Sequence, residues 1–563
     1  MEQLVIGVLV IGVLGLLVIA AATALAPRFN IAAPLLLVVL GIAISFLPFV
    51  PAIEIEPELV LAGILPPLLY SASVSLPAMD FRREFGAIGG LSVVLVILSS
   101  VILGVVFAAL IPGLGLAWGI ALGAIVSPTD AVATSIVKRL GVSGRIVALL
   151  EGESLLNDAT ALVLLRSAIA GAAASVSLPA VAGSFVFAVV VAVLIGYAVG
   201  RLNLWVRARV PDATVNTVIS FTVPFLASIP AELLGASGLV AAVAAGLVTG
   251  RGAPRVLSPQ HRLSDVQVWR AIELILEGAV FLLMGLELYG FVEAAEKDDL
   301  GFLRALGIAA LALLLTVVVR TAYVAPLLVG LHRRAKRGAL VKDRVQSLHD
   351  RLSDPETRGT ALEQFGGRRP RRVTRHDAER LSTRVRRMLG DIDYFLAAPL
   401  GWREGTVVVW AGMRGAITVA AAQTLPADTP NRSLLVLIAF MVAAASLLLQ
   451  GGTLAAVVGW VKPALPDLSS DDERARLMAL LDEAAARAQE DRPGGDASAR
   501  VGKQAAVMVI AAQRRALLNA RDDGAFSADL LQSALANLDA DQITLELKGG
   551  PGDALDGTPP PRS

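Results

Sequence analysis

The segment Trp118-Gly-Ile-Ala-Leu-Gly-Ala-Ile-Val-Ser-Pro-Thr-Asp-Ala-Val-Ala-Thr-Ser-Ile-Val137 is apolar apart from a polar centre. It has the length of a membrane helix, which needs about 20 apolar residues. Pro128 removes a backbone donor and disrupts the helix turn. We therefore expect Thr129 and Asp130 to lie in a broken helix at membrane depth, where unwound carbonyl groups can coordinate a cation. A simple proline kink capped by Asp130 is the alternative.

The composition fits a membrane protein. Of 563 residues, 55% are hydrophobic and 17% are charged, against roughly 25% charged in soluble chains. The formal net charge of +1 argues against a disordered chain or a nucleic-acid binder. The chain has no cysteine, and its four histidines all fall in polar segments. A thiolate site is excluded, a histidine-based zinc or haem site is not expected, and no cofactor or nucleic-acid partner is predicted.

Thirteen apolar segments can be interpreted as membrane helices. They cover residues 4–26, 31–50, 59–76, 88–111, 118–137, 147–170, 181–200, 218–232, 238–250, 268–289, 302–331, 407–425 and 434–461. The first is expected to be a retained span, because a signal peptide has a basic start and a shorter apolar stretch. The sequence thus predicts an all-α, polytopic membrane protein with 13 transmembrane helices.

The charges between these segments predict the orientation. With the N-terminus outside, the external loops before residue 332 and their edges, together with the loop after the twelfth segment, carry three basic residues: Lys297, Arg304 and Arg432. The cytoplasmic loops before residue 332 carry thirteen, which are Arg28, Arg82, Arg83, Lys138, Arg139, Arg145, Arg201, Arg207, Arg209, Arg251, Arg255, Arg262 and Arg270. This bias follows the positive-inside rule, so the C-terminus is predicted to be cytoplasmic.

Two polar blocks, the insert 332–400 and the chain after residue 461, complete the predicted organisation. Residues 1–331 contain helices 1–11, and residues 332–400 form a basic cytoplasmic insert. Residues 401–461 contain helices 12 and 13, residues 462–548 form a helical cytoplasmic tail, and residues 549–563 form a disordered C-terminus. The insert has seventeen Lys and Arg against nine Asp and Glu. It is either a solvated loop or a contact for anionic lipid headgroups. The tail is either a helical bundle that docks on the membrane domain or a second subunit, or a solubilising segment without function.

The sixth apolar segment carries Glu151-Gly-Glu153-Ser154-Leu-Leu-Asn157-Asp158. A charge at mid-bilayer costs at least about 2.5–3.5 kcal/mol and indicates a functional site. Glu151, Ser154 and Asp158 share one helix face, with Asn157 beside them. Carboxylate, hydroxyl and amide oxygens suit Na⁺, Li⁺ or K⁺ rather than soft metals. One carboxyl group can hold a proton or a cation but not both, and this competition is an exchange mechanism.

Two arginines lie inside later apolar segments. Arg320 stands in the eleventh, and Gly412-Met-Arg414-Gly415 in the twelfth suggests a second interrupted helix. Buried arginines need carboxylates or helix C-terminal carbonyls. The expected partners are Glu153 for Arg320, and Asp130 with the broken helix ends for Arg414. Two broken helices in corresponding halves of the chain favour an inverted-repeat transporter.

These motifs together resemble the monovalent cation/proton antiporter family 1, which comprises bacterial sodium/proton antiporters and animal sodium/hydrogen exchangers. The resemblance extends over approximately residues 5–460. It rests on Leu65-Pro-Pro-Leu-Leu69, Ser127-Pro-Thr-Asp-Ala-Val-Ala133, Glu151-Gly-Glu-Ser-Leu-Leu-Asn-Asp-Ala-Thr-Ala-Leu-Val163, Ser237-Gly238, Phe281-Leu-Leu-Met-Gly-Leu286 and Met413-Arg-Gly-Ala416.

The resemblance implies two inverted six-helix repeats, broken crossing helices 5 and 12, a homodimer and elevator-type movement of a core against a dimerisation domain. By matching positions, Asp158 binds the proton or the cation, and Asn157 is the residue associated with electroneutral one-for-one exchange. The other implied roles are cation ligation by Ser154 and the backbone of Thr129, a structural pair of Glu153 with Arg320, and balancing of the helix ends by Asp130 and Arg414. The third segment departs from some relatives, because Tyr70-Ser-Ala-Ser73 has no acidic residue.

We therefore expect an electroneutral Na⁺/H⁺ antiporter, with Li⁺ or K⁺ as other candidate ions, acting in pH homeostasis in the inner membrane of a prokaryote. It is not expected to be an enzyme, and its predicted partners are the lipid bilayer and a second copy of the chain. An uncoupled cation channel and a membrane scaffold that signals through its tail are the alternatives. An electrogenic antiporter is disfavoured by Asn157.

Overall fold

The computed structural model of the protein describes residues 2–29, 31–48, 56–173, 178–297, 302–353, 375–463, 471–490 and 499–547. Its regular elements within these ranges are all helices, with no strand. The chain forms two compact units. Unit 1 consists of Met1–Gly252, Asp265–His332 and Leu400–Leu465, and unit 2 of Ala253–Ser264, Arg333–Pro399 and Pro466–Ser563. The tail end that we expect to be disordered, 549–563, lies outside the described residues.

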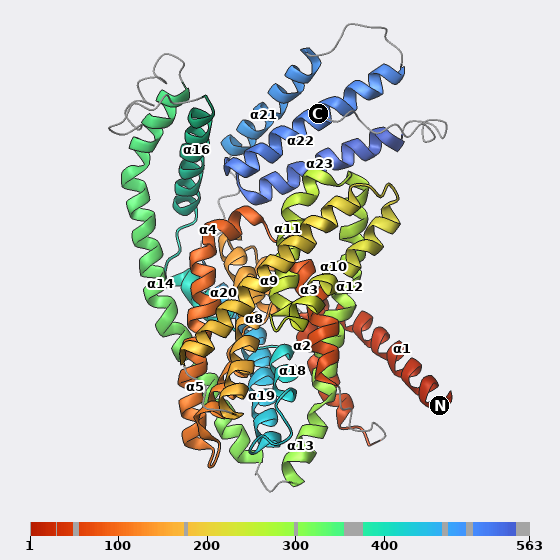
Figure 1. The fold of residues 1–563 in the computed structure, drawn as a ribbon, viewed down its shortest axis with the longest axis vertical. Helices are drawn as coiled ribbons and strands as arrows, with labels where there is room; N and C mark the ends of the chain where they lie inside the picture. Colours follow the sequence, from red (N-terminus) through yellow and green to blue (C-terminus); the bar gives the residue numbers. More distant parts are fainter. Residues whose placement is uncertain are drawn as a thin grey trace. The chain divides into compact units, whose positions relative to one another are not determined.

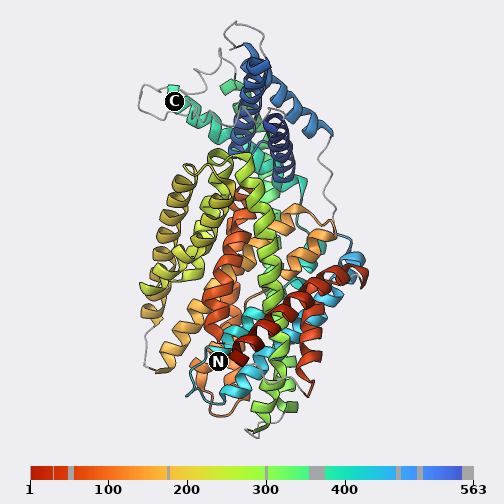
Figure 2. The same cartoon turned by 90° about the vertical axis from the view of Figure 1, so that its right-hand side faces the viewer.

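The helices of unit 1 follow the predicted apolar segments (Figure 1, Figure 2). They are α1 Glu2–Leu25, α2 Ala33–Ser45, α3 Leu65–Ser75, α4 Ala78–Gly89, α5 Val96–Leu110, α6 Gly115–Val126, α7 Val132–Arg139, α8 Gly144–Ala173, α9 Leu178–Arg207, α10 Ala213–Leu233, α11 Gly238–Val256, α12 Pro259–Leu286, α13 Leu288–Lys297, α14 Phe302–Ser353, α17 Trp402–Trp410, α18 Ala416–Gln423, α19 Arg432–Ser446 and α20 Gly452–Val461. Three wider, π-helical turns adjoin these helices. They are η2 Leu59–Ile64 before α3, η3 Gly90–Leu95 between α4 and α5, and η4 Leu447–Gly451 between α19 and α20.

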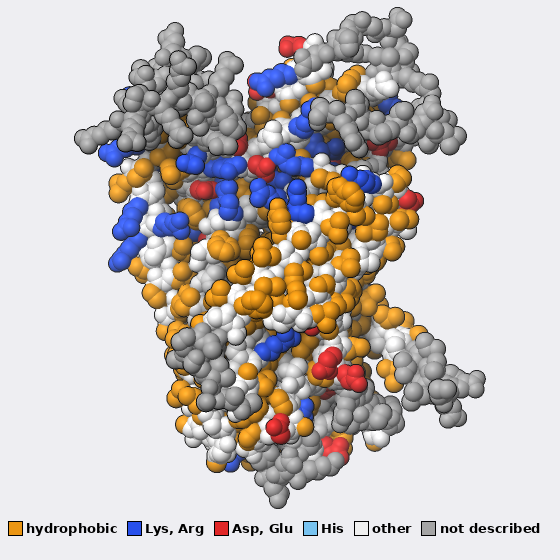
Figure 3. All heavy atoms as spheres, viewed as in Figure 1, with side chains coloured by type: hydrophobic (Ala, Val, Ile, Leu, Met, Phe, Trp, Pro, Cys, Tyr) orange, Lys and Arg blue, Asp and Glu red, His pale blue; other side chains and the backbone are white. Residues whose placement is uncertain are grey.

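Many of these helices expose hydrophobic side chains. Among the described residues, seven helical stretches are long and apolar enough to cross a membrane, and three shorter apolar helices accompany them. Leu194 on α9 and Leu314 on α14 are more than 60% exposed, and Figure 3 shows hydrophobic side chains spread over the viewed face. Lipid can cover such a surface, whereas water disfavours it.

We name two sets of helices in unit 1, which also contact each other where α8 packs on α3 and α9. The crossing set consists of α4–α8, α14 and α17–α20, in which α6 packs on α5, α8 and α18, and α20 on α7 and α17. The α9–α12 set also includes α1–α3. There, α10 packs on α9 and α3, and the backbones of α2 and α12 meet at Gly41 and Gly285.

The contact between α5 and α6 depends on glycine. A Cβ atom at Gly123 would overlap the carbonyl oxygen of Ser100, and one at Gly119 would overlap that of Gly104. Small residues four apart allow helix backbones to approach this closely in a membrane.

Replacing Gly123 with alanine should therefore destabilise the protein by about 1–3 kcal/mol, the usual effect of overpacking. Thermal unfolding of the purified protein in detergent measures this loss. Gly86→Ala on α4 is the matched control, because a Cβ at Gly86 meets no other atom within 4 Å. Equal melting temperatures of the two variants would contradict the packing argument.

Unit 2 contains the end of α14 and the helices α16 Arg375–Ala397, α21 Asp471–Glu490, α22 Ala499–Asp523 and α23 Ala528–Leu547. The described part of the insert is thus a helical hairpin. A small apolar core of Val345, Leu352, Val385 and Leu389 holds α14 against α16. In the tail, α22 packs against both α21 and α23, and the three run side by side in Figure 1.

Candidate functional site

The polar centre of the fifth predicted segment is unwound. α6 ends at Val126 and α7 begins at Val132, and Pro128 lies between them as predicted. One backbone group that this break leaves outside a helix finds its hydrogen-bond partner in the second break. The amide of Asp130 donates to the carbonyl of Met413 at 2.8 Å. Thr129 and Asp130 therefore lie in the break itself.

The twelfth predicted segment is interrupted in the same way. α17 ends at Trp410 and α18 begins at Ala416. Between them, the amide of Arg414 donates to the hydroxyl of Ser446 at 3.0 Å, and that hydroxyl donates to Gln450. The two breaks thus lie against each other, with α19 and η4 supporting the second.

The helix ends at these breaks carry opposite partial charges, negative at C-termini and positive at N-termini. The guanidinium group of Arg414 donates to the carbonyl of Val126, the last residue of α6, at 3.0 Å, and to that of Gly412. A carboxylate oxygen of Asp130 accepts the amide of Val132 at 2.8 Å, and its other oxygen lies against Gly415, which precedes α18. Each side chain therefore stabilises two helix ends.

Of the two predicted partners of Arg414, the broken helix ends are found, whereas Asp130 is not among its described contacts. The arginine binds the negative helix ends, and the aspartate lies at the positive ones. Each charge is therefore compensated by main-chain dipoles and not by the other side chain.

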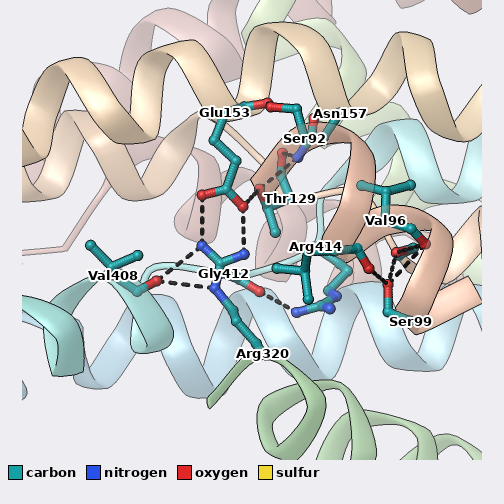
Figure 4. Close-up of polar contacts among 12 residues, drawn as sticks. Ser92, Val96, Ser99, Thr129, Glu153, Asn157, Arg320, Val408, Gly412 and Arg414 are labelled. Atoms are coloured by element: carbon teal, nitrogen blue, oxygen red, sulfur yellow. Dashed lines mark hydrogen bonds and ion pairs between the residues drawn. The ribbon is translucent and has the colours of Figure 1, made fainter. Parts of the chain in front are cut away.

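Glu153 and Arg320 form a buried ion pair between α8 and α14 (Figure 4). Both terminal nitrogens of Arg320 donate to the carboxylate, at 2.5 and 2.8 Å. The same guanidinium also donates to the carbonyl of Val408 on α17, at 3.0 and 3.1 Å. Such bidentate, charge-assisted contacts fix the geometry of both partners, so α8, α14 and α17 are held together at the level of the breaks.

Asn157 binds the first break directly. Its side-chain amide donates to the hydroxyl of Thr129 at 2.7 Å and to the carbonyl of Thr129 at 3.2 Å. The Thr129 hydroxyl donates in turn to Glu153 at 3.2 Å. The amide oxygen of Asn157 is buried and has no hydrogen-bond partner in the described structure, so it remains available to a ligand.

Asp158 has a different environment from the other acidic residues. It is 4% exposed, and no hydrogen bond or ion pair of its side chain is found within the described ranges. It lines a cavity that is otherwise apolar, formed by Pro128 together with Ala124, Ile125, Ala161, Leu162, Leu165, Ile417 and Ala421. Ser154, one turn earlier on α8, is also buried.

The structure therefore brings most of the predicted residues together around the two breaks. It also adds residues that the sequence analysis did not single out. Ser92 donates to the carbonyl of Glu153, and Ser99 and Ser127 are in contact with each other. Both of these hydroxyl groups line a second cavity with Asn157 and Arg414. Serine is common in membrane helices, so only its position beside the break could have indicated this role.

Glu273 and Glu277 are further acidic residues, and they were not among the predicted site residues. They lie one turn apart on α12, within the tenth predicted segment, and both are half-buried. An acidic residue inside an apolar segment is itself a signal of function, and that signal was present in the sequence.

Comparison with known proteins identifies the family of this chain. The family model described as "Sodium/hydrogen exchanger, transmembrane" matches residues 14–342 and 383–460. An uncharacterized Na⁺/H⁺ exchanger of Mycobacterium tuberculosis is 29% identical over 470 residues, which cover 82% of this chain and 76% of that protein. The sodium, potassium, lithium and rubidium/H⁺ antiporter of Bacillus subtilis is 33% identical over 297 residues, or 51% of this chain and 44% of that one.

A solved structure has a similar fold. The sodium proton antiporter MjNhaP1 from Methanocaldococcus jannaschii, at pH 8, aligns with a TM-score of 0.57 and 17% identity, covering 82% of this chain and 99% of that one. The match supports an all-helical membrane fold of the same kind.

Proposed function

Because this chain belongs to the sodium/hydrogen exchanger family, we propose that it is an electroneutral antiporter that exchanges Na⁺, Li⁺ or K⁺ for H⁺. Members of the family are transporters with several membrane helices, and the chain has the helices that such a protein requires. The transported ions are its cargo, and the proposal includes no cofactor.

One observation supports the proposal above all. Of three acidic side chains, two have their negative charge balanced by neighbouring groups, and the third does not. The charge of Glu153 is neutralised by Arg320, and Asp130 lies at two helix N-termini, where a negative charge is favoured. Asp158 has neither kind of partner within the described structure and faces an apolar cavity. A buried carboxylate without compensation is unfavourable, so Asp158 is the group that needs a proton or a cation.

The competing cation needs further oxygen ligands. We assign Ser154 and the carbonyl of Thr129 to this role, with Asn157 holding Thr129 in place through the hydrogen bonds described above. A single carboxylate that releases one proton for each monovalent cation moves no net charge. The exchange is therefore electroneutral, and an imposed membrane potential should not change its rate.

The movement that exposes Asp158 to each side in turn is proposed to be a displacement of the crossing set against the α9–α12 set, in the manner of an elevator. The proposal includes thirteen membrane helices in two inverted six-helix repeats, a homodimer, and a role in pH homeostasis. It also places the protein in the prokaryotic inner membrane with the N-terminus outside. The insert and the tail, 332–400 and 462–548, are then cytoplasmic, and the basic insert is a candidate contact for anionic lipids.

The test is proton movement in proteoliposomes containing the full chain, driven by Na⁺, Li⁺ or K⁺ in turn across a range of pH. We expect cation addition to release protons, with a rate that falls at acid pH because protons compete for Asp158. Choline, a cation that the protein is not expected to transport, serves as the control. Cation flux without opposing proton flux would indicate a channel. An absence of both fluxes would instead favour a scaffold.

A further inference from the structure

Unit 2 joins segments that are far apart in the sequence. The tail helices α22 and α23 bind two other parts of the chain by ion pairs. One is the end of α11 with the start of α12, within Ala253–Ser264, which we name the α11–α12 connection, and the other is the helix α16. These contacts differ in their burial, and the difference suggests separate roles.

The contact with the α11–α12 connection is partly buried. Arg262 binds Asp539 of α23 with two nitrogens, one of them at 3.1 Å. Arg514 of α22 binds the same carboxylate at 2.8 Å. The three side chains are only 13–17% exposed. A bidentate contact shared by two arginines is among the stronger ion pairs, so this cluster keeps the tail attached to the connection.

The contact at the end of α22 is more exposed. Asp522 binds Arg255 of α11 at 2.7 Å, and its carbonyl accepts a hydrogen bond from Arg387 of α16 at 2.9 Å. Asp523 binds Arg386 of α16 at 2.7 Å. Arg255 and Arg386 are 42% and 47% exposed, and their partners Asp522 and Asp523 are 28% and 18% exposed, so the difference from the cluster lies mainly in the arginines. We name these five residues the Asp522–Asp523 junction.

The junction connects the two helix sets of unit 1 through the chain itself. Arg255 lies in the last turn of α11, a member of the α9–α12 set. The helix α16 lies between α14 and α17 in the sequence, and both of these belong to the crossing set. When the junction is closed, the two sets are thus tied by ion pairs as well as by their direct packing.

Exposed ion pairs are weak and depend on salt. Each contributes a factor of at most about five to an equilibrium, and salt screens it, with a Debye length of about 10 Å at 0.1 M. The junction can therefore open and close, whereas the more buried Arg262–Asp539–Arg514 cluster persists.

We infer that the Asp522–Asp523 junction is a releasable clamp, which slows transport when it is closed and opens as the ionic strength rises. The inference rests on the proposed movement of the crossing set, because a tie between two sets matters only if they move against each other. A transporter of salt cations would in this way respond to the salt in the solution around its tail.

The first test compares transport by the full chain with that of the Asp522→Asn/Asp523→Asn variant in proteoliposomes. At low ionic strength we expect the variant to be about two- to fivefold faster. Added choline chloride should accelerate the wild type and leave the variant unchanged. The matched control is Asp482→Asn/Asp541→Asn, which neutralises two exposed aspartates of the tail and should behave like the wild type.

The second test uses the absence of cysteine from the chain. Arg386→Cys/Asp523→Cys places a unique pair of thiols in the junction. A short bis-methanethiosulfonate crosslinker, which forms a reducible disulfide with each thiol as sulfinate leaves, then joins α16 to α22. Crosslinking should slow transport several-fold, and a reductant should restore it. The two single-cysteine variants, treated identically, control for modification alone.

The outcomes separate this inference from the function on which it rests. If the wild type moves no protons in response to any cation, the proposed function fails. If the wild type transports but neither charge removal nor crosslinking changes its rate, the clamp is wrong and the antiporter stands. Equal acceleration in the control variant would also overturn the clamp, because the effect would then follow the net charge of the tail and not the junction.

Discussion

Asp158→Asn should reduce cation-dependent proton movement in proteoliposomes to the level of protein-free vesicles. Asparagine has the size of a protonated aspartate, so it fits the same cavity but can neither release a proton nor neutralise a cation. Because Glu153 and Asp130 are already compensated by Arg320 and by helix ends, no other carboxylate at the breaks can replace it.

A second measurement distinguishes lost binding from lost folding. Ligands that bind the native state raise its melting temperature, so Na⁺ or Li⁺ should stabilise the wild type and leave Asp158→Asn unaffected. Glu151→Gln is the matched control. This residue lies two turns earlier on α8 and is near Lys138, at 3.9 Å, so its variant should retain both transport and stabilisation by the cation. Full transport by Asp158→Asn would refute the assignment.

Arg320→Met should produce the largest loss of stability. Removing one partner of a buried ion pair leaves an uncompensated charge and typically costs about 3–5 kcal/mol. Here the substitution leaves Glu153 buried with Thr129 as its remaining partner and also frees the carbonyl of Val408. Thermal unfolding in detergent and the yield of monodisperse protein measure the effect.

Two comparisons make the result specific. Arg166→Met is the matched control, because Arg166 pairs with Glu232 at 3.4 Å while both side chains are exposed, and exposed pairs contribute about 0–1 kcal/mol. Adding Glu153→Gln to Arg320→Met removes the unpaired charge and should recover part of the stability. If Arg320→Met melts at the same temperature as Arg166→Met, the pair does not support the fold.

The sequence alone was sufficient for features that depend on residue type. Proline at 128 and the glycines around Arg414 predicted both breaks, and charge in an apolar segment singled out Glu153, Asp158 and Arg320. The broken helix ends were also predicted as partners of Arg414, but the individual carbonyl groups could not be predicted in the same way. They are the carbonyls of Val126 and Gly412, and a carbonyl group is present at every residue, so no side chain reports its position.

The arginine-rich composition of the insert left a solvated loop and a contact for anionic lipids as alternatives, and neither of them predicted a helical hairpin. Its helical hairpin depends on Val345, Leu352, Val385 and Leu389, four apolar residues from two separated helices. Their spacing in each helix is visible in the sequence. The pairing of the two helices, which residues 354–374 separate in the sequence, depends on tertiary contacts that the spacing does not specify.

The glycine contacts between α5 and α6 determine which parts of the molecule can slide. Where side chains meet, a rotamer change can accommodate a shift of one helix along another. At Gly119 and Gly123 the opposing groups are main-chain atoms, which have no such freedom. α5 and α6 must therefore keep their register in every conformation, and relative displacement is confined to surfaces where side chains face each other.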